Sequence, residues 1–121
     1  MGYMLLIHEP VGQRAQRTET EGREAYARMQ RFGEALRAQG KLSASASLAG
    51  LGEAVRVSQA PGSVRRLDGP FAEAKEMLGG FFLLEGVERD EAIALAAQCP
   101  AAEWATVEVR GLAPCYGESL G

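Results

Sequence analysis

The stretch from Thr18 to Gly40 constrains the fold most, because it carries the start, the buried face and the end of one long helix. Thr18 and Glu21 have the spacing of a capping box, in which each residue binds a free backbone N–H group at the helix start. Gly40 is a natural residue to end the helix, since it adopts left-handed backbone without strain. Apolar residues recur every three or four positions between these ends and predict a core-facing side: Tyr26, Met29, Phe32 or Gly33, and Leu36.

Short apolar and alternating runs before and after this helix predict β-strands. Tyr3 to His8 is a continuous apolar run bounded by Pro10, which is typical of a central strand. Val107 and Val109 alternate with polar residues and should face inward. Further strands are expected within residues 42–51, in a hairpin with a five-residue connection around Pro61-Gly62, at residues 81–84, and at residues 104–110.

A second helix is predicted over residues 88–99, because Pro100 stops it. The order is then β-α-β-β-β-β-α-β, which contains two β-α-β units separated by a hairpin. This order predicts an α+β, ferredoxin-like protomer with a mostly antiparallel sheet and both helices on one face. The other face of the sheet would expose Leu, Val and Phe side chains, so we expect a homodimer formed through that face.

The length of 121 residues fits one domain, which we place at residues 1–112, followed by a tail at residues 113–121. A formal net charge of −3 offers no general attraction for nucleic acid or for an anionic membrane surface. Arg65 and Arg66 are expected on a solvated face of the hairpin. The apolar run at the N-terminus is too short to span a membrane.

The chain has two cysteines, Cys99 and Cys115, and one histidine, His8. Neither cysteine has the spacing of a zinc ligand, so we predict no metal site and no cofactor. We interpret both cysteines as reduced thiols in a cytoplasmic protein, with Cys99 serving as a small buried apolar side chain.

The run from Asp68 to Glu76, with the sequence DGPFAEAKE, has both a structural and a chemical interpretation. Asp-Gly favours a turn, Pro70 suits the first position of a helical turn, and Asp68 would cap that turn. Alternatively, the Asp68 carboxylate lies at the mouth of a pocket, where it could act as a general base. Gly69, Pro70 and Phe71 would then form the substrate-binding wall of that pocket.

His8 is open to the same two interpretations. A lone histidine at a strand end is commonly satisfied by backbone groups or water. It could instead meet Asp68 and share a proton with it, which would make His8 and Asp68 the catalytic pair. The expectation for Glu9, the next residue, is an exposed side chain.

Three segments together resemble the DGPF branch of the YCII-related family, over about residues 2–112. They are Tyr3-Met4-Leu5-Leu6-Ile7, the run from Asp68 to Phe81, and Cys99-Pro100-Ala101-Ala102 followed by Val107-Glu108-Val109-Arg110. The resemblance implies a dimeric α/β-barrel built from ferredoxin-like protomers. It also implies two kinds of function, because some relatives resemble lyases that use a His/Asp pair and others are encoded beside, or fused to, alternative sigma factors.

The lyase mechanism does not carry over residue by residue, since those relatives have their histidine in the first helix and residues 19–39 contain none. Our first expectation is nonetheless a metal-independent lyase- or isomerase-like enzyme that acts on a small organic molecule by a mechanism of its own. The alternatives are a non-catalytic accessory or regulatory module associated with alternative sigma factors, and a dimeric scaffold without pocket chemistry.

Overall fold

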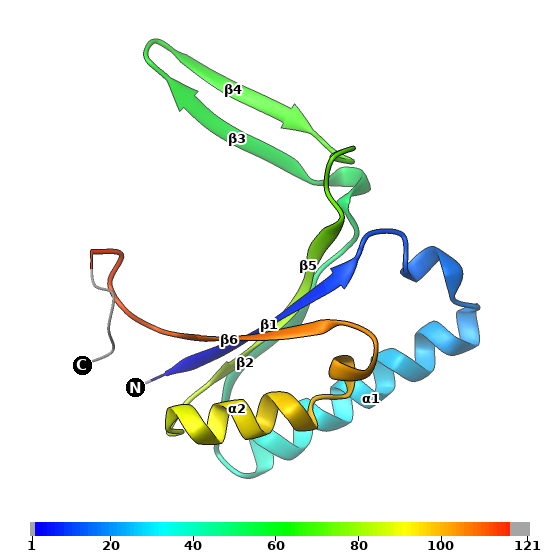
Figure 1. Cartoon of the computed structure of the whole chain (residues 1–121), viewed down its shortest axis with the longest axis vertical. Coiled ribbons are helices and arrows are strands. Elements are labelled where there is room, and N and C mark those ends of the chain that lie inside the picture. Colours follow the sequence, from blue (N-terminus) through cyan, green and yellow to red (C-terminus); the bar gives the residue numbers. More distant parts are fainter. Residues whose placement is uncertain (1, 117–121) are drawn as a thin grey trace.

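Residues 2–116 are described by a computed structural model, in which they form a four-stranded antiparallel sheet, two α-helices on one face of it, and a projecting β-hairpin (Figure 1). The order of strands across the sheet is β2-β5-β1-β6, and β3 pairs only with β4. The predicted ferredoxin-like order is confirmed. The elements are β1 (Tyr3–Pro10), α1 (Glu19–Ala38), β2 (Leu42–Ser47), β3 (Val55–Ala60), β4 (Ser63–Asp68), β5 (Glu76–Leu84), α2 (Arg89–Gln98) and β6 (Thr106–Gly111), with short 3-10 turns η1 (Arg14–Gln16), η2 (Leu51–Glu53) and η3 (Pro100–Glu103).

The helix α1 begins and ends as its sequence predicts. Glu21 N–H donates to Thr18 Oγ1 at 3.1 Å, and Thr18 N–H donates to Glu21 Oε1 at 2.8 Å, which completes the capping box. Gly40 has a φ of 71°, the left-handed conformation expected there. Leu36 is buried, but Tyr26 is 53% exposed, so its predicted place in the core is wrong.

The core lies between the sheet and the two helices, and β1 runs through the middle of it. Leu5 on β1 pairs with Phe82 on β5 and with Val109 on β6, and all three side chains belong to the core or pack against it. Phe82 also meets Phe32 of α1 edge to face, with ring centroids 5.2 Å apart. Val107 and Val109 face inward as predicted. None of the helices within residues 2–116 is long and apolar enough to cross a membrane.

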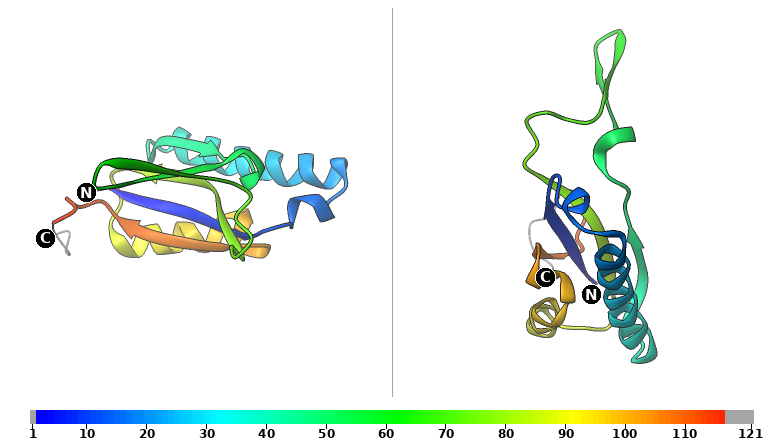
Figure 2. Two further views of the ribbon diagram at one scale, coloured as in Figure 1. Left: turned by 90° about the horizontal axis from the view of Figure 1, so that it is seen from above. Right: turned by 90° about the vertical axis from the view of Figure 1, so that its right-hand side faces the viewer.

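The hairpin formed by β3 and β4 stands on the side of the sheet opposite the helices (Figures 1 and 2). Its turn consists of Pro61 and Gly62, with Ala60 paired to Ser63, so the connection is shorter than the five residues predicted. Gly62 has a φ of 79°, which explains a glycine in this tight turn. Both strands are almost entirely exposed.

The predicted tail begins just after β6, which ends at Gly111. Residues 112–116 are exposed, and the remainder of the tail, residues 117–121, lies outside the described part of the chain.

Candidate functional site

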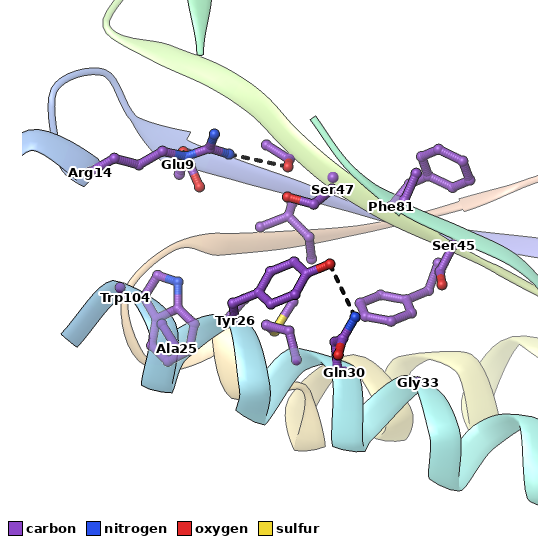
Figure 3. Close-up of a pocket in the computed structure, with 18 of the residues that line it drawn as sticks. Glu9, Arg14, Ala25, Tyr26, Gln30, Gly33, Ser45, Ser47, Phe81 and Trp104 are labelled. Carbon is purple, nitrogen blue, oxygen red and sulfur yellow. Dashed lines mark hydrogen bonds and ion pairs between the residues drawn. The ribbon is translucent and has the colours of Figure 1, made fainter. Parts of the chain in front are cut away.

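A cavity of about 620 Å³, open to solvent, lies between α1 and the β2–β5 side of the sheet (Figure 3). Small residues on both walls leave part of the space between the helix and the sheet unfilled. Toward the end of α1, by contrast, Phe32 and Leu36 pack directly onto the sheet. The small residues that line the cavity include Gly22, Ala25 and Gly33 on α1, and Ser45, Ala46, Ser47, Gly79 and Gly80 on the strands.

A partly buried ion pair forms part of the cavity wall. Glu9, at the end of β1, is only 5% exposed, and its Oε1 accepts a hydrogen bond from Arg14 Nε at 2.5 Å. Arg14 also donates to the carbonyl oxygen of Leu48 at 2.7 Å and to that of Gly79 at 3.3 Å. The guanidinium therefore joins the end of β1 to β5 and to the loop after β2, and fixes the carboxylate in place.

A β-bulge makes room for this carboxylate. Ile7 pairs with Gly80 and His8 pairs with Leu78, so Gly79 has no partner on β1. A Cβ atom on Gly79 would lie 2.6 Å from Glu9 Oε2, so any other residue there would displace the Glu9 carboxylate from its present position. Gly79 thus accommodates Glu9, whereas at Gly80 a Cβ atom would lie 2.8 Å from the Ala46 carbonyl oxygen of β2.

The sequence-based expectation that Glu9 is exposed is wrong. Tyr3, Leu5 and Ile7 occupy the inward positions of β1, and Glu9 continues their alternation. Extending this period by one residue would have identified a carboxylate on the inner face of a strand. Tyr26 was likewise assigned to the core from its helical spacing alone. That spacing shows which face of the helix a residue occupies, but not whether another element packs against that face.

The rest of the cavity wall carries hydroxyl and aromatic groups. The Tyr26 hydroxyl accepts a hydrogen bond from Gln30 Nε2 at 3.0 Å and points into the cavity (Figure 3). Trp104, which follows η3, lines the cavity, and the Cζ of Arg17 lies 5.3 Å from its ring centroid. Ser45 and Ser47 add hydroxyl groups from β2.

The structure places the two predicted catalytic residues outside this cavity and in contact with different partners. His8 lies on the open face of the sheet, away from the helices, with Nε2 2.6 Å from Glu108 Oε1. Asp68 ends β4, and its Oδ1 accepts a hydrogen bond from Arg66 Nε at 2.8 Å. No hydrogen bond or ion pair within residues 2–116 joins His8 to Asp68. Their catalytic role stays a prediction.

The predicted substrate-binding residues, Gly69, Pro70 and Phe71, lie at the base of the hairpin. Gly69 N–H donates to the Ala54 carbonyl at 2.7 Å, and a Cβ at Gly69 would come within 2.2 Å of the Leu51 carbonyl oxygen. Phe71 is buried beneath the Arg56 guanidinium, whose Cζ is 3.7 Å from the ring centroid. In this position Gly69 and Phe71 contact residues 51–56 beside the hairpin, and Pro70 lies between them in sequence.

After Pro70 the chain forms one hydrogen-bonded turn and no helix. Ala74 N–H donates to the Phe71 carbonyl at 3.0 Å, which closes a single turn, and the chain then enters β5. Asp68 bonds Arg66 instead of capping a helix, because it still belongs to β4.

Within residues 2–116, the structure contains no cluster of three or more His, Cys, Asp or Glu side chains suited to a metal ion. Cys99 is 2% exposed, as predicted, with its Sγ 3.9 Å from Met29 Sδ. Burial raises the pKa of this thiol, which keeps it in the unreactive protonated form.

Comparison with known proteins identifies the family. The family model of the YCII-related domain matches residues 1–115. A search of curated proteins finds no significant match. Because the family model covers nearly the whole chain, the protein belongs to the YCII-related family.

Proposed function

We propose that this YCII-related protein is an enzyme that performs lyase- or isomerase-like acid–base chemistry on a small organic molecule bound in the cavity between α1 and the sheet. The observation that carries the proposal is Glu9, a buried carboxylate in the wall of a cavity of about 620 Å³. Pockets for small molecules have volumes of roughly 300–1,000 Å³ and hold a few well-placed polar groups among apolar ones. This cavity has that size and that mixture.

Glu9 has the geometry of a general base. Arg14 binds Oε1, and no described residue donates a hydrogen bond to Oε2. Oε2 could take a proton from a substrate carbon, and the electron pair left behind would form a double bond as a leaving group departs. Returning the proton at a neighbouring carbon would instead isomerise the substrate. The Tyr26 and Ser47 hydroxyls are available to donate to a substrate carbonyl.

The variant Glu9→Gln tests this proposal, since it removes the base and keeps a side chain of the same size. The purified protein is incubated with a pool of small metabolites from cell extract, and mass spectrometry shows which compound is consumed. We expect Glu9→Gln to slow that turnover by about 100-fold or more. Turnover by Glu9→Gln at the wild-type rate would show that Glu9 is not the base.

Four further variants keep the test informative. Glu19→Gln is the matched control, because Glu19 also lines the cavity but is exposed and bonded to Arg23 at 2.6 Å. It should leave turnover unchanged. If Glu9→Gln fails to fold, Tyr26→Phe tests the same cavity, since this exposed side chain contributes little to the core. His8→Ala and Asp68→Asn test the predicted catalytic pair in the same assay.

The proposal includes a homodimer formed through the open face of the sheet. Met4 pairs with Leu83 and Leu6 pairs with Phe81 on this face, which no helix covers. A continuous apolar strip supports association of two copies, because it would otherwise face water. His8 and Glu108 lie on the same face, so a partner protomer would cover them as well.

An accessory or regulatory module associated with alternative sigma factors is the second candidate. The observation that favours it is the hairpin, which exposes four large apolar side chains: Val55, Val57, Val64 and Leu67. Exposed apolar residues on a projecting element are a feature of protein-binding surfaces. A pull-down from cell extract tests it, and recovery of a sigma factor that is lost with Val57→Ser and Val64→Ser would support it. Recovery of no specific partner, together with clear turnover of a metabolite, would exclude this candidate.

A further inference from the structure

We infer that the cavity selects organic acids and that Arg17 binds their carboxylate group. The inference rests on the proposed function, because it concerns the same cavity, but it addresses recognition rather than proton transfer. The supporting observation is the way in which neighbouring residues hold the cationic side chain of Arg17 in the cavity wall.

The Arg17 guanidinium is fixed from two directions. Its Cζ lies 5.3 Å from the centroid of the Trp104 ring, which orients the flat group. Its Nη2 donates to Gln13 Oε1 at 3.3 Å, and Gln13 Nε2 in turn donates to the Trp104 carbonyl oxygen at 2.8 Å. Such positioning lowers the entropy that a ligand contact would otherwise cost.

Arg17 forms no hydrogen bond or ion pair with a carboxylate among the residues that the structure describes. Its charge helps to lower the pKa of Glu21, but the Glu21 carboxylate accepts its hydrogen bond from Thr18 N–H. Arg14, three positions earlier, is neutralised by Glu9, and Glu19 of the cavity wall is bonded to Arg23. Of the five N–H groups of the Arg17 guanidinium, only one has a described acceptor. A guanidinium with free N–H groups matches the two oxygens of a carboxylate, which it can bind through two parallel hydrogen bonds.

The remaining lining residues indicate the body of the ligand. Ile7, Met29 and Phe82 form an apolar wall, and Tyr26 presents a hydroxyl group. Glu34 and Arg37, at the other end of α1, carry opposite charges and add no net charge. The matching ligand is a small acid with an apolar or aromatic body.

Arg28 provides a matched control on the same aromatic ring. Its Cζ lies 5.4 Å from the Trp104 centroid, but Glu103 accepts hydrogen bonds from both of its terminal nitrogens. These bonds raise the pKa of Arg28 and offset its charge. Arg28 is also absent from the cavity wall, so its replacement should leave acid binding unchanged.

The test measures the affinity of the full chain for pairs of probes that differ only in charge, namely phenylacetate with phenylacetamide and 3-phenylpropionate with its amide. Titration calorimetry should show that the wild-type protein prefers each acid. Arg17→Gln should weaken binding of the acids by about 10- to 100-fold and leave the amides unaffected. Arg28→Gln should retain the wild-type affinities within about twofold.

Wild-type protein that binds acids no better than amides, or Arg17→Gln protein that keeps the preference for acids, would overturn the inference. The thermal midpoint of each variant separates loss of binding from loss of folding. If Arg17→Gln does not fold, Arg17→Lys replaces it. Its single ammonium group should also weaken binding of the acids relative to the amides.

The two proposals fail in different ways. Loss of turnover in Glu9→Gln without any preference for acids would leave the acid–base function standing and reject the role of Arg17. Binding of acids through Arg17 without turnover of any metabolite would reject the enzyme and leave the binding site.

Discussion

The two cysteines differ in exposure, and this difference determines which of them reacts. Cys99 lies in the core, where burial raises the pKa of its thiol, whereas Cys115 is exposed. Because only the thiolate is nucleophilic, we expect iodoacetamide to modify Cys115 in the native protein and to leave Cys99 intact. Peptide mass spectrometry after short labelling checks this. Both cysteines should react once denaturant unfolds the chain, and native labelling of Cys99 at the rate of Cys115 would contradict the prediction.

Single residues were also where the sequence was least informative about the site. Cys99 was correctly predicted as buried, since a small apolar residue before Pro100 fits the end of a helix. The alternation of β1 places Glu9 on the inner face, but its ion pair with Arg14 and the space beside Gly79 depend on residues from other parts of the chain. No local pattern near Glu9 specifies that guanidinium.

At the scale of elements, the capping box of α1 has a measurable contribution to stability. Thr18→Ala removes the Oγ1 that accepts the Glu21 N–H, so we expect the free energy of unfolding to fall by about 1 kcal/mol. Urea denaturation measures the change. Thr20→Ala is the control, because Thr20 lies exposed in the same turn without a capping role. Equal stability of the two variants would show that the cap contributes nothing.

The same cap should depend on pH. The hydrogen bonds from Thr18 lower the pKa of Glu21 below its ordinary value of 4.5. A carboxylate with a lowered pKa in the folded state stabilises the protein above its unfolded pKa, and this contribution is lost as pH falls through the lowered value. The stability difference between wild type and Glu21→Gln should therefore be constant near neutral pH and shrink in acid.

Elements defined by local sequence were predicted well, and the space between elements was not. The caps of α1, the alternation in β6 and the turn at Pro61-Gly62 each depend on neighbours in sequence. The segment after Asp68 has equally clear turn chemistry and forms a single turn at residues 71–74, whereas the close approach of Gly69 to the Leu51 carbonyl involves a residue far away in sequence. The cavity arises where small residues of α1 and of the sheet face one another, and only the fold brings them together.

At the scale of the whole molecule, the proposed homodimer depends on the open face of the sheet. We expect the wild-type protein to sediment as a dimer at micromolar concentration. Leu6→Lys places a charge in the middle of the apolar strip and should weaken the dimer by at least about 100-fold. Ile93→Lys is the control, because Ile93 is an exposed apolar residue on α2. A wild-type monomer, or a Leu6→Lys variant that remains dimeric, would contradict the proposed interface.

The strand order has a further consequence, for the time at which the protein can fold during its synthesis. The strand β1 lies between β5 and β6, and Tyr3 pairs with Gly111. The helix α1 and the hairpin form from neighbouring residues, so they can fold while the ribosome is still adding amino acids. The sheet cannot close until residues 106–111 leave the ribosome, since the last strand covers one edge of the first. Until then β1 presents an unpaired edge, and this interval is when the nascent chain is most exposed to aggregation and to chaperone binding.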